Sequence, residues 1–229
     1  MNTVELAAVR RTYGDVVAID DVSLAVSAHE VVAIVGPSGC GKSTLLDLIC
    51  GLQEPDAGVV KADRAVLMPQ RDLLLPWMSA VENAALPLRI RGADRSAAHV
   101  MMRELGLEGF ESARVWELSG GMRQRVAFAR TLLAGAPVLC LDEPFASLDA
   151  ITRAELQTWL AQALELEPRT VVLVTHDVEE AALLADRVIV LSPRPGRVLA
   201  TLELDTPRPR AAVDAEVIAA RASILEAMR

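Results

Sequence analysis

The chain has 229 residues, enough to build a full hydrophobic core without a disulfide framework or a structural metal. It carries 23 lysines and arginines against 31 aspartates and glutamates, and its formal net charge of −8 argues against a broad electrostatic surface for nucleic acid or anionic lipid. Any polyanion that the chain binds must therefore be held by a few well-aimed groups.

Hydrophobic residues make up 52% of the chain. The longest stretches free of Asp, Glu, Lys and Arg are residues 31–41 and 131–141, far short of the roughly 20 residues that span a bilayer. The first residues show no basic segment followed by an apolar one, so no signal peptide is expected. Cys40, Cys50 and Cys140 are too few for a disulfide framework and none lies in CxxC spacing, which indicates a reducing compartment.

Strand-like patterns begin at the N-terminus. Val4–Tyr13 and Val16–Val26 alternate around a Tyr13-Gly14-Asp15 turn and are predicted to form antiparallel strands. Val31–Val35 is an uninterrupted apolar run, which is typical of a strand buried on both faces of a parallel sheet. Three later runs have the same character: Val138–Leu141, Val171–Val174 and Val188–Leu191.

Helical periodicity separates these runs. The apolar faces consist of Met122, Val126, Ala129 and Leu133, and of Leu156, Trp159, Leu160, Ala163 and Leu164. Alternating strands and helices predict an α/β fold with a central parallel sheet. The segment from about Arg71 to Glu117 lacks a clear strand and is predicted to be a helical insertion. After a short strand at Arg197–Leu202, a final amphipathic helix is expected, with Val213, Val217, Ile224, Leu225 and Met228 on its apolar face.

Residues Gly36 to Ser43 read GPSGCGKS and match the phosphate-binding pattern G-x-x-x-x-G-K-[ST] between a predicted strand and a predicted helix. Glycines let backbone N–H groups turn toward phosphate oxygens, and the helix N-terminus adds its dipole. Lys42 would supply charge to the β- and γ-phosphates, and Ser43 a hydroxyl to Mg²⁺. The predicted nucleotide-binding residues here are Gly36, Ser38, Gly39, Cys40, Gly41, Lys42, Ser43 and Thr44. Cys40 is also expected to react with alkylating reagents unless ATP blocks it.

Two carboxylates follow the second buried run. Asp142 directly follows Val138–Leu141, and Glu143 comes next. In a P-loop enzyme the first carboxylate orients Mg²⁺, and the second is placed to polarise the attacking water. A solvated acidic loop is the simpler alternative, and the pairing with the phosphate loop favours the catalytic interpretation.

Residues 118–125, LSGGMRQR, resemble the LSGGQ signature of the ATP-binding-cassette (ABC) ATPases, with Met122 in place of the usual glutamine. The resemblance covers nearly the whole chain in order. It implies a P-loop NTPase fold of the ABC type: a RecA-like parallel-sheet core, a small antiparallel β subdomain and a helical insertion. Within a single domain of residues 1–229, it implies a nucleotide-binding core at 1–70 and 119–204, a helical subdomain at 71–118 and a C-terminal linker and helix at 205–229.

The resemblance also implies roles for individual residues. Tyr13 would stack on adenine, Gln70 would reach Mg²⁺ and the water, and His176 would contact the γ-phosphate. Ser119, Gly120 and Gly121, with Asp149 of the D-loop, would complete the nucleotide site of a second copy. Each has a simpler structural alternative: an edge-strand aromatic for Tyr13, a loop residue for Gln70, a helix N-cap for Ser119 and a structural histidine for His176.

The cofactors implied are ATP and Mg²⁺, and the activity is ATP hydrolysis coupled to transport. Residues 71–83 and 192–197 resemble ATPases of nitrate, sulfonate and taurine importers. That resemblance implies a homodimer at the cytoplasmic face of the membrane, permease subunits docked on the helical subdomain near Leu73–Leu75 and Trp77, an indirect solute-binding protein and no nucleic-acid partner. Lipoprotein-release and cell-division ATPases remain alternatives, and ABC ATPases acting on DNA or ribosomes are less favoured. A GTPase is disfavoured because no N-K-x-D motif occurs.

Overall fold

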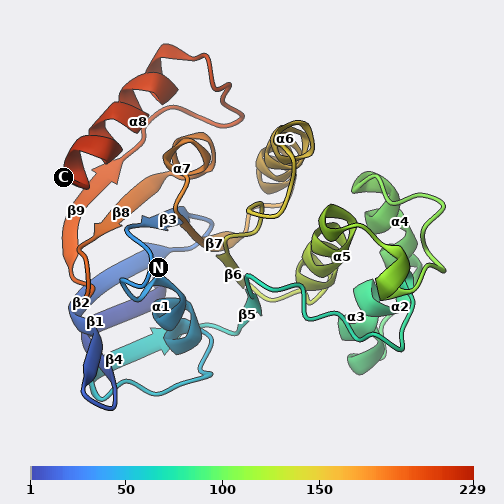
Figure 1. Ribbon diagram of the computed structural model, residues 1–229, viewed down its shortest axis with the longest axis horizontal. Helices are drawn as coiled ribbons and strands as arrows, with labels where there is room; N and C mark the ends of the chain where they lie inside the picture. Colours follow the sequence, from blue (N-terminus) through green and yellow to red (C-terminus); the bar gives the residue numbers. More distant parts are fainter. Residues whose placement is uncertain (1) are drawn as a thin grey trace. The chain divides into compact units, whose positions relative to one another are not determined.

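The protein is described by a computed structural model of residues 2–229 (Figure 1). The chain divides into two compact units. The first unit comprises residues 2–67, 137–143 and 157–229, and the second comprises residues 68–136 and 144–156. Helix α6 (Ala150–Leu166) begins in the second unit and ends in the first.

The first unit is built on a sheet with the strand order β5-β6-β7-β3-β8-β9. These strands are β3 (Val31–Val35), β5 (Ala65–Met68), β6 (Val138–Asp142), β7 (Thr170–Thr175), β8 (Arg187–Leu191) and β9 (Val198–Glu203). Strand β6 pairs parallel with β7, β7 with β3 and β3 with β8, whereas β9 pairs antiparallel with β8. Every residue of β3, β6 and β7 is buried, as their uninterrupted apolar sequences predict.

A second sheet of order β2-β1-β4 is antiparallel and consists of β1 (Asn2–Tyr13), β2 (Val16–Ser27) and β4 (Ala57–Ala62). The predicted hairpin around Gly14 is confirmed, since Tyr13 pairs with Val16. The buried face of this sheet, including Val4 and Leu24, shares one hydrophobic core with α1 (Lys42–Ile49) and the parallel sheet. The core thus supports α1, the helix that follows the phosphate loop, from two sides.

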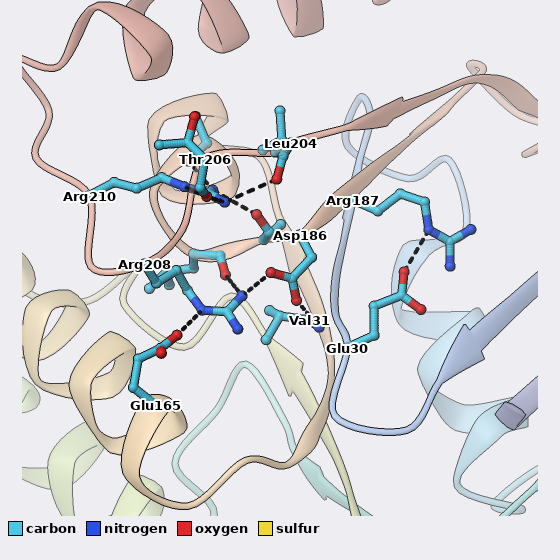
Figure 2. A network of polar contacts seen from close by, with 12 residues as sticks. Glu30, Val31, Glu165, Asp186, Arg187, Leu204, Thr206, Arg208 and Arg210 are labelled. Atoms are coloured by element: carbon cyan, nitrogen blue, oxygen red, sulfur yellow. Dashed lines mark hydrogen bonds and ion pairs between the residues drawn. The ribbon is translucent and has the colours of Figure 1, made fainter. Parts of the chain in front are cut away.

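The C-terminal segment packs beside α7 (Val178–Leu184), where α8 (Ala215–Ala227) lies along β8 and β9 (Figure 1). Two arginines secure it (Figure 2). Arg208 donates to the Asp186 carboxylate at 2.6 Å and to the Leu184 carbonyl at 3.0 Å, and its Nε lies 3.7 Å from Glu165. Arg210 donates to the carbonyls of Ala182, Ala185, Leu204 and Thr206.

The second unit contains α2 (Ala80–Ala84), α3 (Leu86–Ile90), α4 (Ser96–Glu104), the 3-10 turn η1 (Val115–Glu117) and α5 (Gly120–Leu132). Phe128 of α5 packs against Phe145, with ring centroids 6.1 Å apart. Asn83 is fully buried, and its side chain bonds to the backbone of Leu75 and Ser79, which anchors the loop before α2. The residues of α5, which the sequence analysis assigned to the nucleotide-binding core, lie in this unit because α5 packs on α2 and α4.

The expected apolar face of the last helix is partly wrong. Helix α8 starts at Ala215, so Val213 precedes it and is 83% exposed. Leu225 is also exposed, and the buried residues of α8 are Val217 and Ile224. The helix has apolar residues around much of its circumference, so the periodicity of its sequence identified its buried face poorly.

Candidate nucleotide-binding and hydrolysis site

The phosphate loop joins β3 to α1, as predicted. Gly41 adopts φ +104°, and a Cβ at this position would lie 2.5 Å from the Ile19 side chain and 2.9 Å from the Ala18 carbonyl oxygen. Gly39 has φ +75°, and nothing lies within 4 Å of the position its Cβ would take. Only glycine adopts these conformations readily, and such a loop directs backbone N–H groups inward at a helix start. The residues present therefore fit a bound phosphate.

Lys42 is folded across this loop. Its side chain is buried, and its Nζ donates to the carbonyls of Gly36 at 2.8 Å and Pro37 at 3.0 Å. Ser38 and Gly39 are exposed, Ser43 is exposed at the start of α1, and Thr44 is half-buried behind it. The phosphate loop itself thus holds the Lys42 ammonium group, which would contact a phosphate bound in that loop.

Cys40 is less accessible than the sequence suggested. Its thiol is 1% exposed, and burial raises its pKa, an effect that nearby Lys42 only partly offsets. The thiolate is the reactive form of cysteine. The expectation of ready alkylation is therefore wrong for this conformation.

Parallel register brings the catalytic candidates to one sheet edge. Asp142 pairs with Val174 and Val35 pairs with Thr175, so β6, β7 and β3 end side by side. The carboxyl ends of parallel strands are where ligands bind in α/β folds. Three residues that are far apart in sequence lie at this edge: Lys42 opens α1 after β3, Asp142 ends β6, and His176 follows β7.

Asp142 is 8% exposed, and burial raises the pKa of its carboxyl, while a hydrogen bond from Ser43 and the charge of Lys42 act in the opposite direction. A hydroxyl and a carboxylate in contact form the oxygen donor set that Mg²⁺ uses in P-loop enzymes. Within residues 2–229, no cluster of three or more His, Cys, Asp or Glu side chains could hold a metal alone. A magnesium site here would rely on substrate phosphates for further ligands.

Glu143 has an unusual backbone. Its φ is +47°, and its N–H donates to the Val174 carbonyl at 2.8 Å. Its Oε1 lies 3.1 Å from Nδ1 of His176, whose side chain is 61% exposed. A non-glycine residue with positive φ is costly and is found at functional sites more often than elsewhere. The structure therefore places the predicted base and the predicted γ-phosphate contact in direct contact.

Tyr13 ends β1 and is 43% exposed. Its hydroxyl donates to Gln53 at 2.7 Å, and the Arg11 guanidinium lies over its ring, 5.1 Å from the centroid. Gln53 in turn donates to Asp47 of α1. Sequence reasoning missed Arg11 and Gln53 because neither belongs to a motif, yet they fix the orientation of the ring.

The second unit gathers the remaining candidates. Ser119 is the N-cap of α5, and its hydroxyl accepts the Met122 N–H at 3.2 Å. Ser119 and Gly120 are exposed, and a cavity of about 340 Å³ is lined by residues that include Gln70, Gly120 and Ser147. The segments that contain Gln70, the signature residues and the D-loop residue Ser147 thus meet within this unit.

Arg123 and Asp72 line this cavity, and further contacts hold the residues next to it in sequence. Arg123, whose role was not predicted, donates to Asp72 at 3.0 Å and to the Leu118 carbonyl at 2.9 Å. Gly121 lies against Leu148, since its Cβ would be 3.2 Å from that side chain. Asp149 accepts the N–H groups of Ile151 and Thr152, which makes it a cap for α6, and these bonds lower its pKa. The N-cap alternative considered for Ser119 therefore describes its contact in this chain, and Asp149 has a similar local role.

Comparison with known proteins agrees with these features. The family model described as ABC transporter matches residues 19–146. The chain is 45% identical over 209 residues to the Taurine import ATP-binding protein TauB of Burkholderia pseudomallei (strain 1710b), covering 85% of this chain and 80% of that protein. It is 41% identical over 210 residues to the TauB protein of Escherichia coli O6:K15:H31, covering 86% and 82%.

A relative from Methanocaldococcus jannaschii, described as an uncharacterized ABC transporter ATP-binding protein, is 41% identical over 226 residues and covers 93% of this chain and 84% of its own. Among solved structures, the dimeric post-hydrolysis state of the ATP-binding cassette MJ0796 bound to ADP and Pi superposes with a TM-score of 0.81 at 33% identity. That match covers 89% of this chain and 99% of the other. No helix within residues 2–229 has the length and apolar character needed to cross a bilayer. The chain belongs to the ABC transporter family and is an ATP-binding ATPase subunit of that family.

Proposed function

We propose that this chain binds and hydrolyses Mg-ATP to energise an importer of small solutes in the nitrate, sulfonate and taurine class. The observation that carries the proposal is the meeting of Lys42, Asp142, Glu143 and His176 at one edge of the parallel sheet. The taurine import proteins among its relatives support the solute class.

In this proposal the phosphate loop and Lys42 hold the triphosphate, and Tyr13 stacks on the adenine. Ser43 and Asp142, with Gln70, would hold Mg²⁺, which when bound neutralises phosphate charge. Glu143 accepts the proton of the attacking water, and the His176 imidazole both orients that carboxylate and stabilises the γ-phosphate.

The proposal requires two copies of the chain, because the candidate nucleotide-binding residues form two sets: one around the phosphate loop and one at the start of α5. The signature residues Ser119, Gly120 and Gly121 open α5, a 13-residue helix whose N-terminus suits an anion, and they are at or near the surface of their unit. We propose that they and Asp149 cap the nucleotide held by a second copy, so that ATP closes the pair and hydrolysis releases it. The dimeric solved cassette supports this arrangement.

A surface on the second unit suits the permease. Trp77 is 67% exposed, Trp116 is 70% exposed, and Leu73 and Phe110 are also exposed. The segment that contains Trp77 lies beside the segment that precedes Trp116, because Arg114 donates to the Trp77 carbonyl and the Ala80 N–H donates to the Ala113 carbonyl. Exposed aromatic residues in such a group mark protein contacts. We call Trp77, Phe110 and Trp116, together with the aliphatic Leu73, the aromatic surface. We propose that it docks permease subunits within residues 71–118, at the cytoplasmic face of the membrane, while a solute-binding protein delivers the cargo on the other side.

The direct test is Glu143→Gln, which keeps the shape of the side chain and removes its basicity. We expect ATP affinity within about threefold of wild type, turnover reduced at least about a hundredfold, and an ATP-dependent dimer on size-exclusion chromatography. Lys42→Ala should lose ATP binding itself, and Glu5→Gln, an exposed change on β1, should behave as wild type. Normal turnover by the Glu143→Gln protein would falsify the assignment of the base.

A further inference from the structure

We propose that Thr175 and Glu180 are positioning residues that hold the turn carrying His176 in its working conformation. The inference rests on the proposed function, in which His176 acts at the γ-phosphate. Neither residue is among those proposed above to bind the nucleotide. Both are buried: Thr175 is 1% exposed and Glu180 is 3% exposed.

The contacts bracket His176 on both sides. Thr175 ends β7, and its hydroxyl donates to Oε2 of Glu180 at 2.9 Å. The same hydroxyl oxygen accepts the Asp177 N–H at 3.0 Å. The residues immediately before and after His176 are therefore tied together, and the histidine sits at the middle of a closed turn.

The Glu180 carboxylate determines which way the Thr175 hydroxyl points. A threonine hydroxyl has one proton and rotates freely unless an acceptor holds that proton. With the proton committed to Glu180, a lone pair remains directed at the Asp177 N–H. Without that acceptor, the hydroxyl is free to donate to a nearby backbone carbonyl instead, and the bracket weakens.

Helix α7 links Glu180 to the same turn. Asp177 is the N-cap of α7, and its carboxylate accepts the N–H groups of Glu179 at 2.9 Å and Glu180 at 3.4 Å. Glu180 lies in the first turn of the helix, so its side chain returns to Thr175 while its backbone is held by Asp177. The turn is thus closed by side-chain and main-chain bonds together.

The exposed imidazole needs this support. The His176 side chain is 61% exposed, and its placement depends on the turn and on the 3.1 Å contact with Glu143. The Glu143 side of that contact is anchored to β7, because the Glu143 N–H donates to the Val174 carbonyl. A catalytic group is effective only when surrounding contacts hold it within a fraction of an ångström of its productive position. The Thr175–Glu180 pair supplies that constraint from beneath the histidine.

The test compares Thr175→Val, which removes the hydroxyl at nearly constant volume, with Thr175→Ser, which keeps it. We expect kcat for ATP hydrolysis to fall about tenfold in the valine variant, with KM for Mg-ATP within about twofold, and the serine variant to keep kcat within about twofold of wild type. Glu180→Met and Glu180→Gln form a parallel pair, because the glutamine oxygen still accepts the hydroxyl proton and methionine cannot. The melting temperature of each variant reports whether the fold is intact.

A second readout separates positioning from a purely structural role. In ¹⁵N-histidine-labelled protein, the ring signals of His176 should change in Thr175→Val and Glu180→Met, while those of His29 and His99 stay unchanged. Full kcat in these variants, or an equal loss with serine and glutamine, would overturn the inference. His176→Ala tests the proposed function separately: wild-type turnover in that variant removes the role of His176, whereas an inactive His176→Ala beside a fully active Thr175→Val removes only the positioning role.

Discussion

Asp142 shows how a proposed magnesium ligand opposes stability at the scale of one residue. Its carboxyl is buried at the end of β6, and burial raises its pKa above the ordinary value of 3.8. The folded chain therefore binds a proton at Asp142 more tightly than the unfolded chain does. As the pH rises from 3.8 through the raised pKa, this group lowers the free energy of unfolding, and the loss persists at neutral pH.

Asp142→Asn removes that buried charge. We expect a higher melting temperature than wild type at pH 7, with the difference shrinking as the pH falls toward 3.8, together with loss of ATP hydrolysis. Differential scanning calorimetry across pH measures the first effect. Asp149→Asn is the matched control with the opposite sign, because hydrogen bonds lower the pKa of Asp149, so its removal should not stabilise the protein at pH 7. A less stable Asp142→Asn at pH 7 would contradict the desolvation argument.

At the scale of the element, α5 combines a structural cap with a proposed binding role in one residue. The Ser119 hydroxyl caps the helix by accepting the Met122 N–H. Aspartate is an equally good N-cap, and its charge is favourable at a helix N-terminus. The same charge would repel the triphosphate of a second copy, so one substitution separates the two roles.

We therefore expect Ser119→Ala to lower the free energy of unfolding by about 1 kcal/mol and Ser119→Asp to keep it near the wild-type value. In the Glu143→Gln background, Ser119→Asp should still bind ATP and should no longer form the ATP-dependent dimer. Urea denaturation and light scattering are the measurements. An intact dimer with Ser119→Asp would leave the N-cap as the whole role of this residue.

Helix α7 depends on the C-terminal segment for its last turn. Arg210 donates to two carbonyls at the end of α7, those of Ala182 and Ala185, and to two in its own segment (Figure 2). The last carbonyls of a helix have no partner within it, and a guanidinium satisfies several at once. The segment after β9 thereby completes the helix that follows His176.

Replacement of Arg210 by methionine should lower the free energy of unfolding by about 2 kcal/mol, since hydrogen bonds from a charged donor are lost while apolar volume is kept. Lysine should restore little, because a single ammonium cannot reach the same set of carbonyls. Arg229→Met, at the exposed C-terminus, is the control and should be neutral. Urea denaturation measures all three, and a change below about 0.5 kcal/mol for Arg210→Met would show that the cap contributes little.

At the scale of the whole molecule, apolar residues that stabilise the fold are distinct from the exposed apolar residues of the proposed docking surface. Leu74 is buried in the second unit, whereas its neighbours Leu73 and Trp77 are exposed. The sequence analysis placed permease docking near Leu73–Leu75 and Trp77 as a group. The structure assigns Leu74 to the interior and leaves Leu73 and Trp77 to the aromatic surface.

Trp77→Glu should therefore leave the melting temperature and the ATPase activity of the isolated chain unchanged and abolish co-purification with the permease. Val213→Glu changes another exposed apolar residue, outside the aromatic surface, and should keep permease binding. Leu74→Glu should fail to fold, which confirms the division between interior and surface. Retained permease binding by Trp77→Glu would move the docking site elsewhere.

The amino-acid sequence alone determined the fold class, the phosphate loop and the chemistry-bearing residues. These features depend on local physics: runs of apolar residues make buried strands, glycines permit positive φ, and motif residues keep a set order. Such patterns account for the hairpin at Gly14, the buried β3, β6 and β7, Lys42 at the start of α1 and Asp142 at the end of β6.

Tertiary structure decided the rest, because long-range packing leaves no local pattern. The strand order brings Nδ1 of His176 within 3.1 Å of Oε1 of Glu143, although the two residues are 33 positions apart in the sequence. Packing in the folded chain also buries the Cys40 thiol away from reagents. The bonds from Thr175 to Glu180, and from Arg210 to α7, join residue types that are common on any surface. Their importance arises only when folding removes water from around them, since a polar group becomes costly to leave unpaired once it is buried.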